Sequence, residues 1–319
     1  MTRDMQAAMG AAPCRCDMGG KAFPVPCRPQ SGATGRPTTI CDESFDGERA
    51  LYALRDALLR GVAFEGPADG ESPLKEASGV DVVDGTFRLR YPLWHARRFS
   101  LSGCVADEGC RAAIWYAEDA DIRDTSLLGP KAVRECRGVS LTRCRVSSDE
   151  FGWMTDDVRM RDVDMEGEYA FLRTSGLRAS DLRLSGKYSF QYVQDALIEG
   201  SVLDTKDAFW HSENMTVVDS VLRGEYLGWY STGLTLIRCR IEGTQPLVRC
   251  EGLRLVDCEM VGCDLAFEGS DVEASVRGRI DSVRDPRSGR IEADEVGEVV
   301  HDTAGGCGAT IVSGGRLMS

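Results

Sequence analysis

DALIEGSVLDTKDAFWHSE occupies residues 195–213, and NMTVVDSVLRGEYLGWYST follows it directly at residues 214–232. The two 19-residue segments align without a gap and carry apolar residues, serines and tryptophan at matching places. All five tryptophans of the chain share position 16 of this repeat, and all eight tyrosines fall in one short window of it. A fixed period of this length predicts a solenoid, in which residues one period apart stack on one another.

The pattern inside each unit predicts strands rather than helices. Positions 2, 4 and 9 are almost always apolar, as in Ala196, Ile198 and Leu203, and this alternation has the period of a strand with one buried face. Position 1 suits a corner with a left-handed or tight-turn backbone, because it is nearly always Gly, Asp or Asn. It recurs at Gly79, Arg98, Asp119, Gly138, Asp157, Gly176, Asp195, Asn214, Gly233, Gly252 and Asp271.

Short strands, tight corners and a 19-residue period together predict an all-β protein, a single-stranded right-handed parallel β-helix. We expect about eleven coils from Asp56 onward, stacked ~4.8 Å apart. Residues 39–280 would form this β-helix and residues 281–302 a C-terminal cap that shields the open edge. Residues 1–38 and 303–319 carry no register, so we expect a disordered N-terminal extension and a disordered tail.

Composition narrows the function and the location. The net charge of -13 argues against a nucleic-acid partner, because phosphate binding needs a basic surface. No apolar run could span a membrane and no signal-peptide core is visible, so we expect a cytoplasmic protein without a membrane partner. Most of the 13 cysteines fall in apolar columns, as Cys239 and Cys258 do at position 7, which indicates buried free thiols.

Positions 12–17 form the third side of each coil and carry the aromatic residues together with many charges. Strand alternation would put positions 13, 15 and 17 on the outer face and the tryptophans of position 16 toward the interior. The tryptophan column is then either a stacked core or, if the strand bends, a groove that stacks against sugars or other rings. Tyrosine, tryptophan and mixed charges on one face are what a polyhydroxylated ligand requires. A solvated face with interleaved salt bridges would have a similar composition.

Two dense patches on this side supply the candidate site residues. The candidate catalytic residues are His95, Arg111, Tyr116, Lys131, Glu135, Lys206, Asp207 and His211. The candidate ligand-binding residues are Arg90, Tyr91, Arg173, Lys187, Tyr188, Tyr192, Tyr226 and Tyr230.

The two patches allow several kinds of chemistry. A Lys or Arg could abstract a proton in a β-elimination, and Glu135 with Glu150, one coil apart, could be the carboxylate pair of a glycoside hydrolase. His95 and His211 lie six coils apart and cannot share a metal ion, so we expect no metal site and no cofactor.

Several separate segments resemble an uncharacterised bacterial family of pectin-lyase-like β-helix proteins. They are DGERA at 46–50, GESPLKE at 70–76, LRYPLWH at 89–95, CRAAIWY at 110–116, GKYSFQY at 186–192, TKDAFWH at 205–211 and GTQPL at 243–247. The resemblance covers about residues 41–300 and implies a right-handed β-helix, but no activity. Members are sometimes labelled as hydrogenases, which the cysteine spacing does not support because no iron–sulfur or nickel–iron pattern is present.

Two functions remain open from the sequence. The first is a carbohydrate-active protein, a lyase, glycoside hydrolase or isomerase, that binds an oligosaccharide or small polar ligand on the aromatic face. The second is a non-catalytic scaffold or binding module whose aromatic face docks a protein or oligosaccharide.

Overall fold

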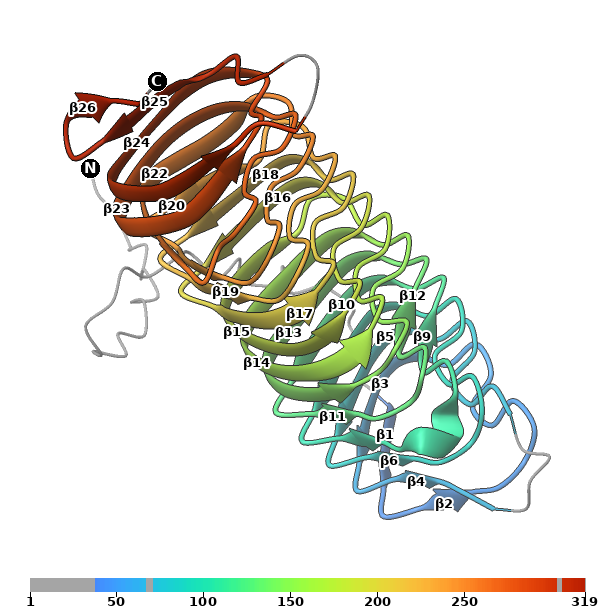
Figure 1. Ribbon diagram of the computed structural model, residues 1–319. Helices are drawn as coiled ribbons and strands as arrows, with labels where there is room; N and C mark the ends of the chain where they lie inside the picture. Colours follow the sequence, from blue (N-terminus) through green and yellow to red (C-terminus); the bar gives the residue numbers. More distant parts are fainter. Residues whose placement is uncertain (1–37, 67–70, 303–305, 319) are drawn as a thin grey trace, which may run out of the picture. The chain divides into compact units, whose positions relative to one another are not determined.

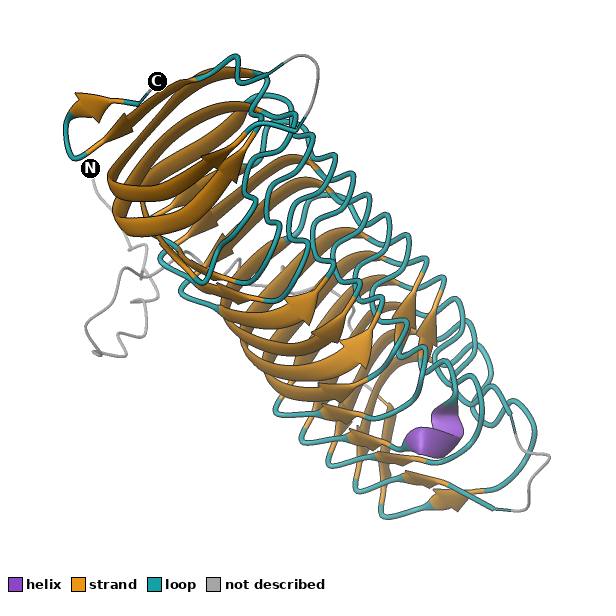
Figure 2. Ribbon diagram, viewed as in Figure 1, coloured by secondary structure: helices purple, strands orange, loops and turns teal. Residues whose placement is uncertain are grey.

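The computed structural model describes residues 38–66, 71–302 and 306–318. These residues form an all-β solenoid of about 14 turns, with mostly parallel strands and almost no helix (Figures 1 and 2). Adjacent coils pair in register one repeat apart, as Ala196 does with Met215. The all-β, parallel-coil architecture expected from the sequence is therefore confirmed. In the described part of the chain, no helix is long and apolar enough to cross a membrane.

Two sides of each coil are strands, and some strands run through the corner between them. The first side holds β1 (Thr38–Cys41), β3 (Arg55–Arg60), β5 (Ser78–Val83), β7 (Arg97–Ser102), β10 (Glu118–Arg123), β16 (Gln194–Glu199), β18 (Glu213–Val218), β20 (Thr235–Ile237) and β25 (Thr310–Ser313). The second side holds β2 (Ser44–Phe45), β4 (Ala63–Phe64), β6 (Thr86–Phe87), β8 (Val105–Ala106), β11 (Ser126–Leu127), β17 (Val202–Lys206), β19 (Val221–Arg223) and β21 (Arg240–Glu242). Longer strands extend past this corner: β13 (Arg137–Ser147), β14 (Asp156–Glu168), β15 (Arg178–Lys187), β22 (Leu253–Val261), β23 (Asp271–Arg284) and β24 (Ser288–Val300).

The remaining elements are short. On the third side, β9 (Ile114–Trp115) and β12 (Val133–Arg134) pair in parallel as a separate two-stranded sheet, and in the last coils β23 and β24 extend onto this side. A single 3₁₀ turn, η1 (Glu108–Cys110), lies within the coil that carries two extra residues. The last strand, β26 (Arg316–Leu317), pairs antiparallel with β25.

The corners have the backbone that the sequence predicts. Position 1 lies in the left-handed region, as at Asp195 (φ 55°) and Gly176 (φ 67°). Position 6 forms a second such corner, with Asp219 at φ 50° and Gly200 at φ 57°. Gly and Asp are enriched at both positions because Gly lacks a Cβ and Asp tolerates this conformation better than most residues.

The third side is built differently from the alternating strand expected there. In most coils, residues at positions 13, 15 and 17 have positive φ, as in Tyr188 (61°), Phe190 (62°) and Tyr192 (56°). Their N–H groups donate alternately to the next coil and to the preceding one, Tyr188 to Lys206 O at 2.7 Å and Phe190 to Ala170 O at 2.8 Å. A backbone of this kind has no pleat, so the period-2 rule does not hold on this side.

The interior position of the third side is therefore 15, and the assignment of that position to the outer face was wrong. Phe171, Phe190 and Phe209 are fully or almost fully buried and stack in sequence, with ring centroids 5.1 and 5.2 Å apart. They complete a core whose other columns are the apolar residues of positions 2, 4 and 9. Tryptophan is absent from the buried core of the described residues.

The solenoid has about 14 turns, more than the eleven coils counted from Asp56 onward. At the start, β1 and β2 form a coil ahead of Asp56, pairing with β3 and β4, and this coil lies within the expected bounds of residues 39–280 except for Thr38. At the other end, β23 pairs with β24 and β24 with β25, both in parallel. Residues 281–300 thus continue the coil instead of forming a cap, and residues 310–317 are strands, which corrects the expected tail at 303–319.

The sequence pattern misses the last coils because their period changes. Asp271 pairs with Ser288, which is closer in the sequence than one repeat, and Arg290 pairs with Thr310, which is further away than one repeat. A template of fixed period therefore loses the register. Apart from Thr38, the expected N-terminal extension lies outside the described residues.

Candidate ligand-binding face

The tryptophans of position 16 lie on the outside of the third side and are half-buried. The indole N–H groups of Trp153, Trp210 and Trp229 each donate to a backbone carbonyl of the following coil, at 2.7 to 2.8 Å. Trp210 stacks on Trp229 with ring centroids 5.4 Å apart. The sequence left the column open between core and groove. In the structure the column forms the base of the outer face, and the indole N–H groups of Trp153, Trp210 and Trp229 hold these three rings against the following coil.

Position 17 is the exposed column beside the tryptophans. We call it the outer ridge, comprising His95, Tyr116, Glu135, Met154, Arg173, Tyr192, His211, Tyr230 and Arg249, one residue per coil. Every one of these residues has positive φ, and none is β-branched. The regular backbone fixes the side chains in one line along the solenoid.

The first part of the ridge brings together three residues predicted as catalytic. His95 stacks on Tyr116 with ring centroids 5.0 Å apart, and Glu135 follows on the next coil. Partial desolvation and the neighbouring Glu135 carboxylate raise the pKa of Tyr116. A shallow depression of about 430 Å³ lies over these three side chains and extends toward Met154.

Near this depression, Arg134 contacts two tryptophan rings and binds two carboxylates. Its guanidinium lies between two indoles, 5.6 Å from the ring of Trp115 and 5.0 Å from that of Trp153. It also binds Glu135 at 3.2 Å and Glu150 at 2.8 Å. Because one guanidinium holds both carboxylates, Glu135 and Glu150 do not face each other across an open cleft as a glycosidase pair must.

The second part of the ridge is an uninterrupted stack of five side chains. His211 lies between Tyr192 and Tyr230, with ring centroids 5.0 Å away on each side and interplanar angles of 6° and 8°. The guanidinium of Arg173 lies 5.7 Å from the ring of Tyr192, and that of Arg249 lies 5.8 Å from the ring of Tyr230. Ring faces are therefore covered by neighbours, while the Tyr192, His211 and Tyr230 side chains stay exposed to solvent.

Positions 12 and 13 form a separate ion-pair ladder rather than joining the ridge. Its basic residues pair with carboxylates in their own columns: Arg90 with Glu71 at 3.7 Å, Lys131 with Glu150 at 3.1 Å, Lys187 with Glu168 at 2.8 Å, and Lys206 with Glu225 at 3.0 Å. Hydrogen bonds to Glu168 and Glu225 raise the pKa of Lys187 and Lys206. An amine held protonated in this way is a poor base for a β-elimination.

Tyrosines complete the ladder and connect it to the tryptophan column. Tyr188 stacks on Tyr169 with centroids 4.8 Å apart, and Tyr226 packs edge-on against Trp229 at 5.3 Å. At the other end, Tyr91 lies 5.8 Å from Trp94. The face therefore carries aromatic side chains along its length, with Arg134, Leu172 and Gln191 between the tryptophans, and has the ladder along one margin and the ridge along the other.

Two predicted catalytic residues lie apart from these contacts. Asp207 is buried, with 5% of its surface exposed, and burial raises the pKa of its carboxyl group. Arg111 is exposed and follows the 3₁₀ turn η1 with φ 52°. The two expected patches thus divide into ridge residues, which contact one another, and Arg90, Lys131, Lys187 and Lys206, which form ion pairs in the ladder. Within the described residues, no group of three potential metal ligands comes together.

Sequence reasoning missed Arg134 and gave Arg249 no role. Arg134 occupies position 16, where most neighbouring coils have an aromatic or apolar residue. This departure from the column was the feature of the sequence that could have pointed to Arg134. Arg173 and Arg249 bracket the Tyr–His–Tyr run symmetrically, each two repeats away from His211. The symmetry can be interpreted only when the structure shows that the position 17 side chains from Arg173 to Arg249 stack on one another.

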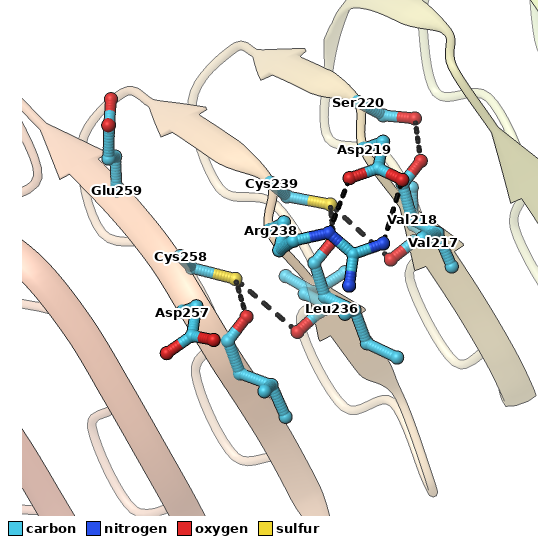
Figure 3. Close-up of polar contacts among 12 residues, drawn as sticks. Val217, Val218, Asp219, Ser220, Leu236, Arg238, Cys239, Asp257, Cys258 and Glu259 are labelled. Carbon is cyan, nitrogen blue, oxygen red and sulfur yellow. Dashed lines mark hydrogen bonds and ion pairs between the residues drawn. The ribbon is translucent and has the colours of Figure 1, made fainter.

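A second shallow depression lies over Asp219, Arg238 and Cys239. Figure 3 shows these three side chains and their polar contacts. Arg238 binds Asp219 through two hydrogen bonds of 2.6 and 2.8 Å, which lowers the pKa of that carboxyl. Beneath it, the Cys239 thiol donates to Val217 O and that of Cys258 to Leu236 O. The cysteines in the described part of the chain are free, as the sequence predicts.

A family model matches residues 38–310, which is most of the chain and all but the last coil of the solenoid. The chain belongs to the family described as Protein of unknown function (DUF3737). This agrees with the resemblance drawn from the sequence to the extent of an uncharacterised β-solenoid family, while the pectin-lyase-like assignment stays a prediction. No curated protein matches the chain.

Three solved structures are similar to this DUF3737 chain. The surface adhesin PfbA of Streptococcus pneumoniae is 7% identical, with a TM-score of 0.30, covering 86% of this chain and 87% of that one. The pentapeptide repeat protein HetL of Nostoc is 14% identical, with a TM-score of 0.24 and coverage of 70% and 92%. The periplasmic alginate epimerase AlgG, as a double mutant, is 9% identical, with a TM-score of 0.24 and coverage of 82% and 70%.

Proposed function

We propose that this protein binds an extended polyhydroxylated chain, an oligosaccharide, along the outer ridge and does not transform it. The observation that carries the proposal is the unbroken, solvent-exposed stack of Tyr192, His211 and Tyr230. Hydroxyl and imidazole groups recur there once per coil, ~4.8 Å apart. A linear ligand with hydroxyl groups along its length can hydrogen-bond to successive coils without bending.

A binding role fits the charges better than catalysis does. Lys131 and Lys206, the candidate bases, are held in ion pairs with Glu150 and Glu225. The candidate carboxylate pair shares Arg134. A catalytic base or acid must be free to reach the reacting atom, whereas hydrogen-bonding residues need only a fixed position.

Hydroxyl-deleting variants test the proposal directly. Tyr192→Phe and Tyr230→Phe keep both stacked rings and remove only the hydroxyl groups. If the hydroxyl groups bind the ligand, each variant weakens oligosaccharide binding about 2- to 13-fold, because a hydrogen bond contributes about 0.5–1.5 kcal/mol. Isothermal titration against a panel of soluble oligosaccharides measures the change, with Tyr52→Phe, outside the ridge, as the matched control.

Unchanged affinity in both ridge variants would show that the hydroxyl groups do not contact the ligand. Failure of the folded wild-type protein to bind any member of the panel would refute the proposal as a whole. Chromatography of the same mixtures checks for products. Turnover that disappears in Lys131→Ala or Lys206→Ala would show that the face is catalytic.

A further inference from the structure

Arg173 and Arg249, at the two ends of the five-residue stack, differ from the basic residues of the ion-pair ladder. Both are exposed, and in the described part of the chain their guanidinium groups contact tyrosine rings without an ion pair to a carboxylate. The basic residues of the ion-pair ladder, in contrast, each hold a carboxylate partner, as Lys187 holds Glu168. Two cations on the ridge are thus left available.

Acidic residues outnumber basic ones in this chain, 51 to 38. Many of its exposed guanidinium groups hold a carboxylate, as Arg143 holds Asp124 and Arg238 holds Asp219. On the ridge, stacking on Tyr192 and Tyr230 holds the two arginines in place without consuming their hydrogen-bond donors. A guanidinium fixed in this way can present two parallel N–H groups to an oxyanion.

The spacing of the two arginines defines the length of the ligand they can share. Arg173 and Arg249 occupy the first and last of five successive coils, so four coil spacings separate them. Four coil spacings are ~19 Å, longer than any single sugar and suited to a chain of several rings. The exposed side chains of Tyr192, His211 and Tyr230 fill the interval with hydrogen-bonding groups.

We infer that the ligand of the ridge is an acidic oligosaccharide, whose oxyanion groups bind Arg173 and Arg249 while its hydroxyl groups lie along the stack between them. The inference rests on the proposed function and adds a substrate class to it. Carboxylate and sulfate groups share the required chemistry, since both present two oxygen atoms to a guanidinium. A ligand with one acid group binds one end only and loses the second contact.

Oligosaccharides of equal length that differ only in charge test whether the ridge prefers acidic ligands, separately from whether it binds oligosaccharides at all. Titrations compare neutral, carboxylated and sulfated oligosaccharides of equal length at low and moderate salt. We expect the acidic ligands to bind more tightly than the neutral one, with the difference shrinking as salt rises. The carboxylated and sulfated arms identify which oxyanion the arginines prefer.

Variants locate the effect on the two arginines. Arg173→Gln and Arg249→Gln should each weaken acidic-ligand binding about 3- to 10-fold and leave the neutral ligand nearly unchanged. Arg178→Gln removes an exposed arginine from the first side and serves as the matched control. Circular dichroism and thermal melting confirm that each variant is folded.

Equal affinity for neutral and acidic ligands would overturn the inference and leave the oligosaccharide-binding function intact. An equal loss in Arg178→Gln would also overturn it, because the effect would then be one of net charge. Binding of none of the ligands would overturn both proposals.

Discussion

Replacing Phe190 with alanine is the most direct test that position 15 of the third side faces the core. Phe190 is fully buried, stacks between Phe171 and Phe209, and has φ 62°. Removing a buried phenylalanine side chain costs about 3–5 kcal/mol through lost burial and the cavity that remains. Its two stacked contacts place it toward the upper part of that range.

Tyr192→Ala is the matched control, because it lies two residues away with φ 56° and therefore changes the side chain in the same backbone conformation. Tyr192 is 45% exposed, so its loss should cost about 1 kcal/mol from stacking alone. Urea unfolding followed by circular dichroism measures both free energies of unfolding. Equal costs for the two substitutions, or a larger cost at Tyr192, would refute the assignment of position 15 to the core.

Three further predictions concern single sites. Asn214→Val should lower the free energy of unfolding by about 1–2 kcal/mol, because a β-branched residue is strained at φ 53°. Calorimetry measures this change, and an unchanged melting temperature would contradict the prediction. Burial raises the pKa of Cys136 and Cys250 to about 11, so iodoacetamide at pH 8 should alkylate exposed Cys41 and spare both thiols, as peptide mass spectrometry would show. Burial also raises the pKa of Asp207 above its unfolded value, so its charge opposes folding at neutral pH and this cost disappears as the pH falls through the folded pKa. Asp207→Asn should therefore raise the melting temperature at pH 7 and have a smaller effect near pH 3; a loss of stability at pH 7 would count against the burial argument.

The sequence was sufficient for the architecture wherever the repeat is regular. The apolar residues of position 4, such as Val82, Leu101 and Ile122, are buried as the alternation predicts, because the strands of the first side have ordinary β geometry. The corner at position 1 was also predictable, since Gly and Asp are the residues that tolerate its backbone. Both inferences depend only on local steric preference and period.

The third side could not be read in the same way. Period-2 alternation assumes a pleated strand, and the positive φ values at Tyr188, Phe190 and Tyr192 remove the pleat. The absence of β-branched residues from position 17 was the available signal of this backbone. The sequence also could not predict which charges pair. Lys131 could equally have paired with Glu135 or Glu150, and the structure shows that it pairs with Glu150.

The two extra residues of the coil that contains η1 have a practical consequence. Register is kept on both sides of this insertion, with Phe99 paired to Ala120 before it and Trp115 paired to Arg134 after it. Additional chain is therefore absorbed between the second and third sides without displacing either flanking column. A foreign loop introduced at η1 would be displayed at a defined height along the solenoid, which makes this turn a natural attachment point for a probe that reports on the neighbouring ridge.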